Sequence, residues 1–223
     1  MNARKLASYI DHTALKSNTT RAEIEQLCLE AREYGFMAVC VNSCWVGLCD
    51  GLLIGTETSV CSVVGFPLGA ACSIAKAGEA RIAIEDGATE IDMVVNVGAL
   101  LSGMDDMVED DICTVKNACA DRAILKAIIE TCLLTDEQKV EACTLAVAAG
   151  ADFVKTSTGF NTAGVVNSGA TVEDVRLMRE VVGLDVGIKA AGGIKTYEDA
   201  MALINAGATR LGCSAGVAIV AGT

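Results

Sequence analysis

Short apolar runs alternate with longer amphipathic segments along the whole chain, and this alternation constrains the fold more than any other feature. Eight runs have the length and composition of buried strands, at 9–13, 36–41, 58–64, 89–95, 123–129, 152–156, 186–190 and 209–212. Helical patterns lie between them, at 19–34, 43–50, 70–86, 104–120, 135–149, 171–182 and 196–206, and a last helix is predicted from about residue 214. Eight β/α units in 223 residues predict an α/β protein: a single (β/α)8 TIM barrel domain over residues 1–223, with a short N-terminal extension.

The spacing of four glycines predicts how the strands align. Each glycine ends a predicted helix and precedes a predicted strand, a position that glycine favours because it adopts a left-handed backbone: Gly35, Gly87, Gly150 and Gly207. The fifth residues after them are Cys40, Asp92, Lys155 and Gly212. Alternate strands of such a barrel share an interior layer, so Asp92 and Lys155 are predicted to face each other near its C-terminal mouth. Glu90 and Arg210 lie two residues lower and are predicted to pair.

Lys155 and Lys189 each stand in an apolar run that opens into a loop of small residues. Burial and a neighbouring ammonium group both disfavour the charged amine, so both lysines are expected to have lowered pKa values, as an imine-forming lysine requires. A lysine at a strand end can also simply extend its amine into solvent. Two such lysines on neighbouring late strands favour the chemical interpretation, although their spacing does not say which one forms the imine.

Three further polar residues are candidates for roles beside the lysines. Asp92 lies in the apolar run 90–96, where an acid needs a partner, and it is interpreted both as a counter-ion and as a group that moves protons. Lys126 repeats the pattern of a lysine in an apolar run, and we expect it to form an ion pair or to bind rather than to act as a nucleophile. The only histidine, His12, is expected to be structural.

A phosphate site is predicted near the end of the chain. Gly192 and Gly193 follow the strand of Lys189, and Ser214 opens the last predicted helix. In (β/α)8 enzymes the loops after strands 7 and 8 often bind phosphate, because backbone N–H groups and a helix N-terminus face the anion. A Gly-Gly pair alone usually marks only a turn. The prediction of a phosphate site therefore depends on the position of this pair, directly after the strand of Lys189. The loop 65–69, which holds the only proline, is expected to contribute shape.

Composition excludes several classes of protein. The net charge is −12, so the chain lacks the basic footprint that nucleic-acid binding requires. No apolar run approaches the ~20 residues that span a bilayer, and the N-terminus lacks the apolar core of a signal peptide, so we expect no membrane partner and a cytoplasmic location. The eleven cysteines include no Cys-x-x-Cys motif and are expected to be reduced and mostly apolar in role, without a structural metal.

Six motifs occur in order along nearly the whole chain, at 10–16 (IDHTALK), 64–69 (VGFPLG), 90–94 (EIDMV), 126–131 (KAIIET), 154–160 (VKTSTGF) and 189–194 (KAAGGI). They resemble the motifs of the deoxyribose-phosphate aldolases, which are lysine-dependent. The resemblance implies that Lys155 forms the Schiff base and that Lys189 and Asp92 donate or accept protons. It further implies that the substrate and its phosphate are held by Thr158, Gly159, Gly192, Gly193 and Ser214, with Asp11 and Lys126 as supporting polar residues.

The same resemblance implies a reaction. It is the reversible retro-aldol cleavage of 2-deoxy-D-ribose 5-phosphate to D-glyceraldehyde 3-phosphate and acetaldehyde, in deoxyribonucleotide and deoxynucleoside catabolism. The implied partners are small sugar phosphates and aldehydes, and no metal or organic cofactor is needed. The sequence does not fix the oligomeric state, and a homodimer is one candidate.

The chain departs from the family pattern at three places. Ala191 stands where many members have serine, and Cys213 stands where a hydroxyl or an alanine is usual, so a phosphate contact is expected to weaken unless backbone amides replace it. The sequence ends at Thr223, without the tyrosine that reaches the site in some members.

Two rival functions remain open at this point. One is another Schiff-base aldolase or a transaldolase on the same fold, distinguished by its donor substrate. The other is a catalytically silent barrel that binds sugar phosphates and uses the lysines only as counter-ions. A purely structural or interaction protein is least expected, because it would not need internal lysines.

Overall fold

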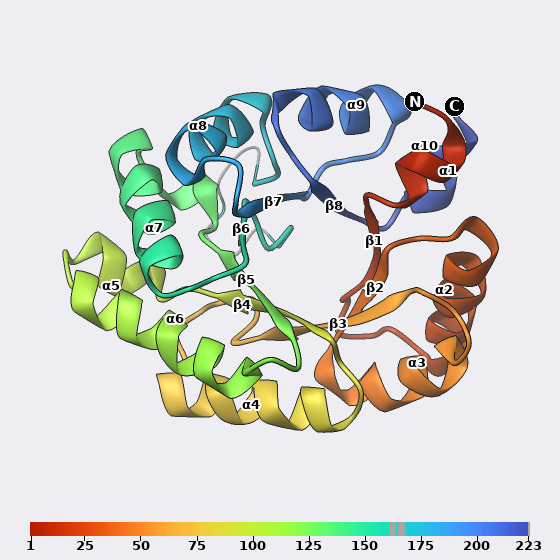
Figure 1. The fold of residues 1–223 in the computed structure, drawn as a ribbon, viewed down its shortest axis with the longest axis horizontal. Coiled ribbons are helices and arrows are strands. Elements are labelled where there is room, and N and C mark those ends of the chain that lie inside the picture. The colour runs from red at the N-terminus through yellow and green to blue at the C-terminus, as the bar shows by residue number, and fades with distance from the viewer. Residues whose placement is uncertain (161–163, 165–167, 223) are drawn as a thin grey trace.

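A closed parallel barrel forms the centre of the computed structural model, which describes residues 1–160, 164 and 168–222. Its strands are β1 (Ile10–Ala14), β2 (Ala38–Val41), β3 (Ser59–Val64), β4 (Glu90–Val94), β5 (Ile124–Ile128), β6 (Phe153–Lys155), β7 (Gly187–Ala191) and β8 (Arg210–Cys213). Neighbours in sequence pair in parallel, and β8 pairs with β1 to close the sheet (Figure 1). The predicted (β/α)8 barrel is confirmed.

Helices surround this barrel and lie between successive strands (Figure 1). They are α1 (Ala3–Ala7), α2 (Arg21–Tyr34), α3 (Val46–Leu53), α4 (Ser73–Glu85), α5 (Val97–Leu101), α6 (Asp105–Cys119), α7 (Asp136–Ala148), α8 (Val172–Val182), α9 (Tyr197–Ala206) and α10 (Gly216–Ala221). Short 3-10 helices occur at Ser43–Trp45 and Thr131–Leu133. The expected N-terminal extension is α1, which packs on α10, so the two chain ends lie side by side. None of the helices described is long and apolar enough to cross a membrane.

Local sequence signals fix where many of these helices begin and end. A capping box starts α2: the Thr20 hydroxyl accepts from the backbone N–H of Glu23, whose carboxylate accepts from the Thr20 N–H. At the other ends, the four glycines predicted to terminate helices all have positive φ: Gly35 at 69°, Gly87 at 112°, Gly150 at 81° and Gly207 at 121°. At all four junctions the N–H of the residue after the glycine donates to the carbonyl oxygen five residues before it, so the count from each glycine starts at an equivalent point.

The helix α5 was not predicted, and the last helix begins two residues later than the expected position of about 214. Residues 97–101 form little more than one turn, which is too short to display a helical period in the sequence. Asn96 starts this turn, because its side-chain oxygen accepts from the backbone N–H of Ala99 at 3.1 Å.

The two faces of the barrel wall have opposite character. Outward side chains of the strands pack under the helices and are apolar and buried, among them Val39, Ile91, Leu125, Val154, Ile188 and Leu211. The interior instead holds charged side chains, each at most 6 % exposed: Asp11, Glu90, Asp92, Lys126, Lys155, Lys189 and Arg210. Buried charges are tolerated only when they are paired, so the barrel interior must satisfy its own charges.

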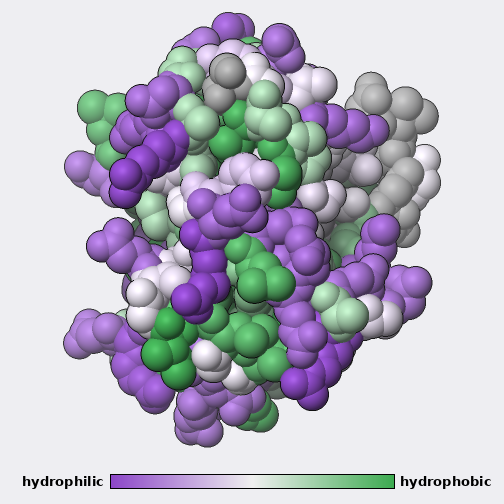
Figure 2. Space-filling view, turned by 90° about the vertical axis from the view of Figure 1, so that its right-hand side faces the viewer, coloured by the Kyte–Doolittle hydropathy of each residue, from purple (hydrophilic) through white to green (hydrophobic). Residues whose placement is uncertain are grey.

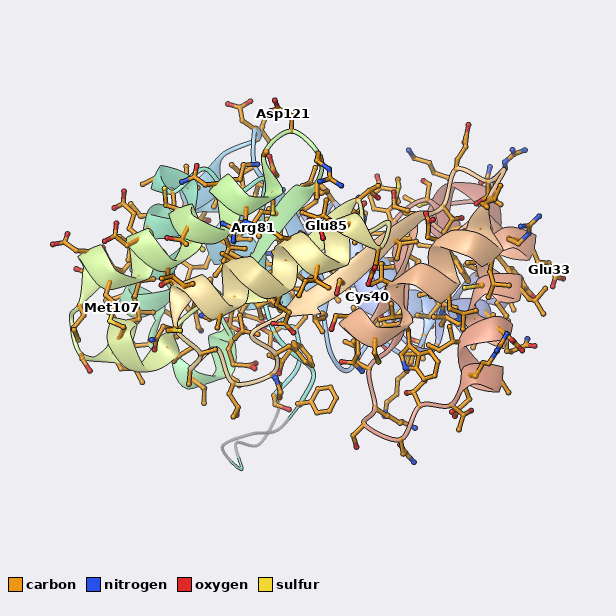
Figure 3. The ribbon with its side chains drawn as sticks, turned by 90° about the horizontal axis from the view of Figure 1, so that it is seen from below. Glu33, Cys40, Arg81, Glu85, Met107 and Asp121 are labelled. Atoms are coloured by element: carbon orange, nitrogen blue, oxygen red, sulfur yellow. The ribbon has the colours of Figure 1, made fainter. Side chains whose placement is uncertain are left out.

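Polar residues at the surface contrast with the buried interior. Figure 3 shows Cys40 near the middle of the molecule, whereas Glu33 and Asp121 lie at its edges; Cys40 is buried and the other two are exposed. Figure 2 shows the right-hand side of Figure 1, where hydrophilic residues separate apolar patches. The exposed apolar side chains include Leu29 and Ile54, at 61 % and 74 % exposure.

Candidate active site

One carboxylate binds three lysines at the centre of the barrel. Asp92 Oδ2 accepts hydrogen bonds from Lys155 Nζ and Lys189 Nζ, each at 2.7 Å, and its Oδ1 accepts from Lys126 Nζ at 2.8 Å. Strand register explains the arrangement, because Asp92 lies beside Lys126 on the neighbouring strand and Lys155 lies beside Lys189. The prediction that Asp92 and Lys155 share a level and face each other is confirmed.

A second layer of charges supports the first. Arg210 Nη1 donates to Glu90 Oε2 at 2.8 Å, which confirms the predicted pair, and also to Asp11 Oδ1 at 2.8 Å. The other oxygen of Asp11 accepts from Lys189 and thereby joins the two layers. Lys126 also binds Glu90, so the whole interior forms one network of four cations and three carboxylates.

The pKa values in the network follow from these contacts. Burial alone would raise the pKa of Asp92, but Lys126, Lys155 and Lys189 hold it well below its usual value. Burial alone would lower the pKa of Lys189, but Asp11 and Asp92 raise it well above its usual value. The lowered pKa expected for Lys189 is therefore wrong, because the sequence did not show that two carboxylates would meet this amine.

A cavity of about 510 Å³ opens above the network. Both Lys155 and Lys189 line it, and so do the predicted substrate and phosphate residues Thr158, Gly159, Gly192, Gly193 and Ser214. Asp92 reaches the cavity only through the two lysines that it binds. Asp11 and Lys126 are fully buried within the network and do not line the cavity, so their predicted supporting role would act through the other charges.

Close backbone approach shapes one wall of the cavity. Gly192 and Gly193 have φ values of 86° and 80°, which favour glycine. A Cβ atom at Gly192 would lie 3.0 Å from the Cα of Gly169 and 3.3 Å from the Cα of Gly159. The loops after β6 and β7 can therefore meet only because glycines stand at these positions.

Two of the departures from the family pattern also lie on the cavity wall. Ala191 ends β7 and offers no hydroxyl. Cys213 ends β8, and burial raises the pKa of its thiol to about 12, so it lines the cavity as a neutral group. The third departure concerns Thr223, which lies outside the described residues.

Several residues at the cavity were not predicted as functional. Lys16 and Lys195 are exposed cations on its wall, and their places shortly after β1 and β7 could have indicated them. The ring of Phe66 lies 6.0 Å from Lys155 Nζ and meets Phe160 edge-on, which agrees with a shaping role for the loop 65–69. His12 does not line the cavity; its Nε2 lies 2.6 Å from Glu30, as expected of a structural residue.

Among the described residues, two groups of side chains have donor atoms close enough for a metal ion. Cys40 and Cys61 lie side by side on β2 and β3, and their sulfurs lie within 4.8 Å of an oxygen of Asp92. Asp11, Cys61 and Glu90 form a similar group. In both groups the carboxylates already bind lysine or arginine, so a metal would have to compete with those cations.

The fold and the cavity together define a (β/α)8 enzyme with lysine amines in its pocket, the class that includes the Schiff-base aldolases. The chain belongs to the DeoC/LacD family of aldolases, whose family model matches residues 5–222. It is 58 % identical over 219 residues to deoxyribose-phosphate aldolase 1 of Bacillus licheniformis, covering 98 % of this chain and 96 % of that protein.

Other relatives agree with this assignment. The deoxyribose-phosphate aldolase of Listeria innocua is 57 % identical over 217 residues, covering 97 % of this chain and 95 % of that protein. Among solved structures, the deoxyribose phosphate aldolase of Aeropyrum pernix, described as a tetramer, superposes with a TM-score of 0.89 at 34 % identity. That match covers 99 % of this chain and 91 % of that one.

Proposed function

We propose that this aldolase reversibly cleaves 2-deoxy-D-ribose 5-phosphate to D-glyceraldehyde 3-phosphate and acetaldehyde, through a Schiff base on Lys155. The observation that carries the proposal is the pair of lysines that share one oxygen of Asp92 and line the cavity. Relatives that are 57–58 % identical over nearly the whole chain bear the name deoxyribose-phosphate aldolase. The reaction serves deoxyribonucleotide and deoxynucleoside catabolism.

The number of carboxylate partners favours Lys155 over Lys189 as the nucleophile. Lys155 has one carboxylate within ion-pair distance, Asp92, whereas Lys189 has two and the fully buried Lys126 has three. The nucleophile must give up its proton, and each carboxylate contact opposes that step.

The reaction begins with attack of the Lys155 amine on the aldehyde carbon of the open-chain sugar. Loss of water from the carbinolamine gives an iminium ion, which serves as the electron sink. A base removes the proton of the C3 hydroxyl, and we assign this role to Asp92 and Lys189 acting through a water molecule. Lys189 gives a proton to Asp92 as it takes one from the water, so Lys189 itself stays charged. The C2–C3 bond then breaks, its electrons form an enamine, and D-glyceraldehyde 3-phosphate leaves.

The second half returns the enzyme to its starting state. The enamine takes up a proton at C2, and Lys189, which its two carboxylates keep charged, is placed to supply it. Water then hydrolyses the resulting iminium ion, releasing acetaldehyde and the free amine of Lys155. The atoms and charges balance without a metal or an organic cofactor.

Borohydride reduction tests this proposal most directly. We expect reduction in the presence of acetaldehyde or 2-deoxyribose 5-phosphate to leave a stable adduct on Lys155, located by mass mapping of peptides. An adduct on Lys189 instead would keep the class of reaction and reverse the roles of the two lysines. The absence of any adduct on the folded protein would contradict the proposal and favour a barrel that only binds sugar phosphates.

The phosphate group is expected to bind beside Gly192, Gly193 and Ser214, with Thr158 and Gly159 on the adjoining wall. The exposed cations Lys16 and Lys195 line the same cavity and would attract the dianion. Replacing both with alanine should raise the KM for 2-deoxyribose 5-phosphate roughly tenfold at low salt, with little change for unphosphorylated 2-deoxyribose. Arg81→Ala, which removes an exposed cation from α4, is the matched control. An equal effect on both sugars would exclude phosphate binding by these lysines.

A cytoplasmic location and a homodimer complete the proposal. All eleven cysteines are free thiols, and a reducing compartment preserves that state. The apolar patches visible in Figure 2 offer surface that a second copy could cover. Light scattering after size-exclusion chromatography measures the mass in solution and tests the assembly.

A further inference from the structure

Glu130 is a buried carboxylate that lies outside the ion-pair network. It follows β5 and is 2 % exposed. Its hydrogen bonds come from nearby segments, and the ammonium group of Lys155 acts on it electrostatically. Its backbone has a φ of 45°, in the left-handed region that residues other than glycine rarely adopt. Such a backbone persists where the surroundings impose it, and it is found most often at functional sites.

The partner of this carboxylate is Thr158, on the cavity wall. Glu130 Oε2 accepts from the Thr158 hydroxyl at 2.5 Å, and both carboxylate oxygens accept from the Thr158 N–H, at 3.3 and 3.4 Å. The hydroxyl in turn accepts from the N–H of Phe160 at 3.0 Å. Glu130 Oε2 is a nearer acceptor for the hydroxyl proton than the backbone oxygen of Phe160, which lies at 3.3 Å. With this proton directed at Glu130 and one lone pair used by the Phe160 N–H, the hydroxyl keeps one lone pair for a donor in the cavity.

These contacts also hold the segment that follows the proposed nucleophile. Thr158 comes three residues after Lys155, where β6 has already ended. A backbone hydrogen bond from Thr131 N to Thr156 O, at 2.8 Å, ties the start of this segment to the same turn that carries Glu130. We call this segment the 156–160 wall, because its residues 158–160 line the cavity, and it is fixed from the loop after β5.

We infer that Glu130 is a positioning residue of the substrate site, which acts through Thr158. It holds the 156–160 wall in place and orients the Thr158 hydroxyl as an acceptor for a hydroxyl group of the sugar phosphate. This inference rests on the proposed function, because it assigns to Thr158 a hydroxyl-bearing substrate. Acetaldehyde, which has no hydroxyl group, does not need this contact.

The inference predicts a selective kinetic effect for Glu130→Gln, which keeps the size of the side chain but weakens its hold on the hydroxyl. The KM for 2-deoxyribose 5-phosphate should rise roughly tenfold while kcat changes much less, because the hydrogen bond to a charged carboxylate becomes a weaker one to a neutral amide. Borohydride trapping of acetaldehyde on the proposed nucleophile should stay within about threefold of the parent protein. Glu141→Gln, at an exposed position of α7, is the matched control and should change neither value.

A double-mutant cycle separates a role through Thr158 from a general structural role. If Glu130 acts through Thr158, Glu130→Gln should cause a much smaller rise in KM once Thr158→Val has removed the hydroxyl, because only the weak contacts with the Thr158 N–H remain. Independent effects that multiply would overturn the inference, and so would a parallel loss of acetaldehyde trapping in Glu130→Gln.

A second pair of variants keeps the test decisive where Glu130→Gln does not fold. Thr158→Val should then show the rise in KM, and Thr158→Ser, which retains a hydroxyl, should restore most of the affinity. Equal KM values for the two would overturn the inference. Failure of the parent protein to cleave 2-deoxyribose 5-phosphate or to form an imine would overturn the proposed function as well, so the two failures are distinguishable.

Discussion

Replacing Lys155 with alanine is expected to abolish retro-aldol cleavage while the barrel remains folded. The variant lacks the amine that forms the iminium ion, so turnover should fall by roughly 10⁴-fold or more. The barrel should tolerate the loss because the network then holds three cations and three carboxylates, and Asp92 still binds Lys126 and Lys189. Steady-state assay of acetaldehyde release and thermal unfolding monitored by circular dichroism measure the two effects.

A control lysine makes this result specific. Lys5 is exposed on α1, and Lys5→Ala should retain normal activity and should still form the borohydride adduct. Near-normal turnover by folded Lys155→Ala would rule out this residue as the nucleophile. Loss of both activity and folding in Lys155→Ala would instead show that the fourth cation is needed for stability, although three cations would balance the three carboxylates.

The barrel and half of its charge network could be predicted because they depend on local and repeated features. The alternation of strands and helices fixes the fold class, and four helices end in the same kind of glycine junction. That shared geometry is why the spacing correctly placed Asp92 beside Lys155 and Glu90 beside Arg210. Predictions of this kind succeed where the positions of both residues can be counted along regular helices and strands.

The contacts of Asp11 could not be predicted in this way. They cross the closure of the barrel between β1 and β8, so they join residues 178 and 199 positions apart in the sequence. Without the register of that closure, nothing indicated that Lys189 would meet a second carboxylate, and the direction of its pKa shift was mistaken. Glu130 was missed for a similar reason, because its partner Thr158 lies on a loop rather than on a regular element.

Replacing Asp92 with asparagine is expected to stop turnover and to destabilise the barrel by about 3–5 kcal/mol. Asparagine has nearly the same shape but no charge, so three buried lysines lose the carboxylate that each of them binds within 2.8 Å. Urea unfolding at pH 7 measures the loss of stability. Asp121→Asn, at an exposed position between α6 and β5, is the control and should change the free energy of unfolding by less than about 0.5 kcal/mol.

The effect of Asp92→Asn should depend on pH in one direction only. Burial alone would raise the pKa of Asp92, but the three lysines hold it well below the value near 4 that the unfolded chain has. A lowered pKa in the folded state contributes stability that is fully present above the unfolded pKa and is lost as pH falls through the folded one.

The difference in the free energy of unfolding between parent and variant should therefore be constant from about pH 7 to pH 5 and should shrink below about pH 4. Asp11, whose pKa its cationic neighbours lower to about 2 against the effect of burial, remains in both proteins, and its pKa should be lower still in the variant, because the charge of Asp92 raises it. A difference that persists unchanged down to pH 2 would mean that shape and packing at Asp92, rather than its charge, hold the centre of the barrel together.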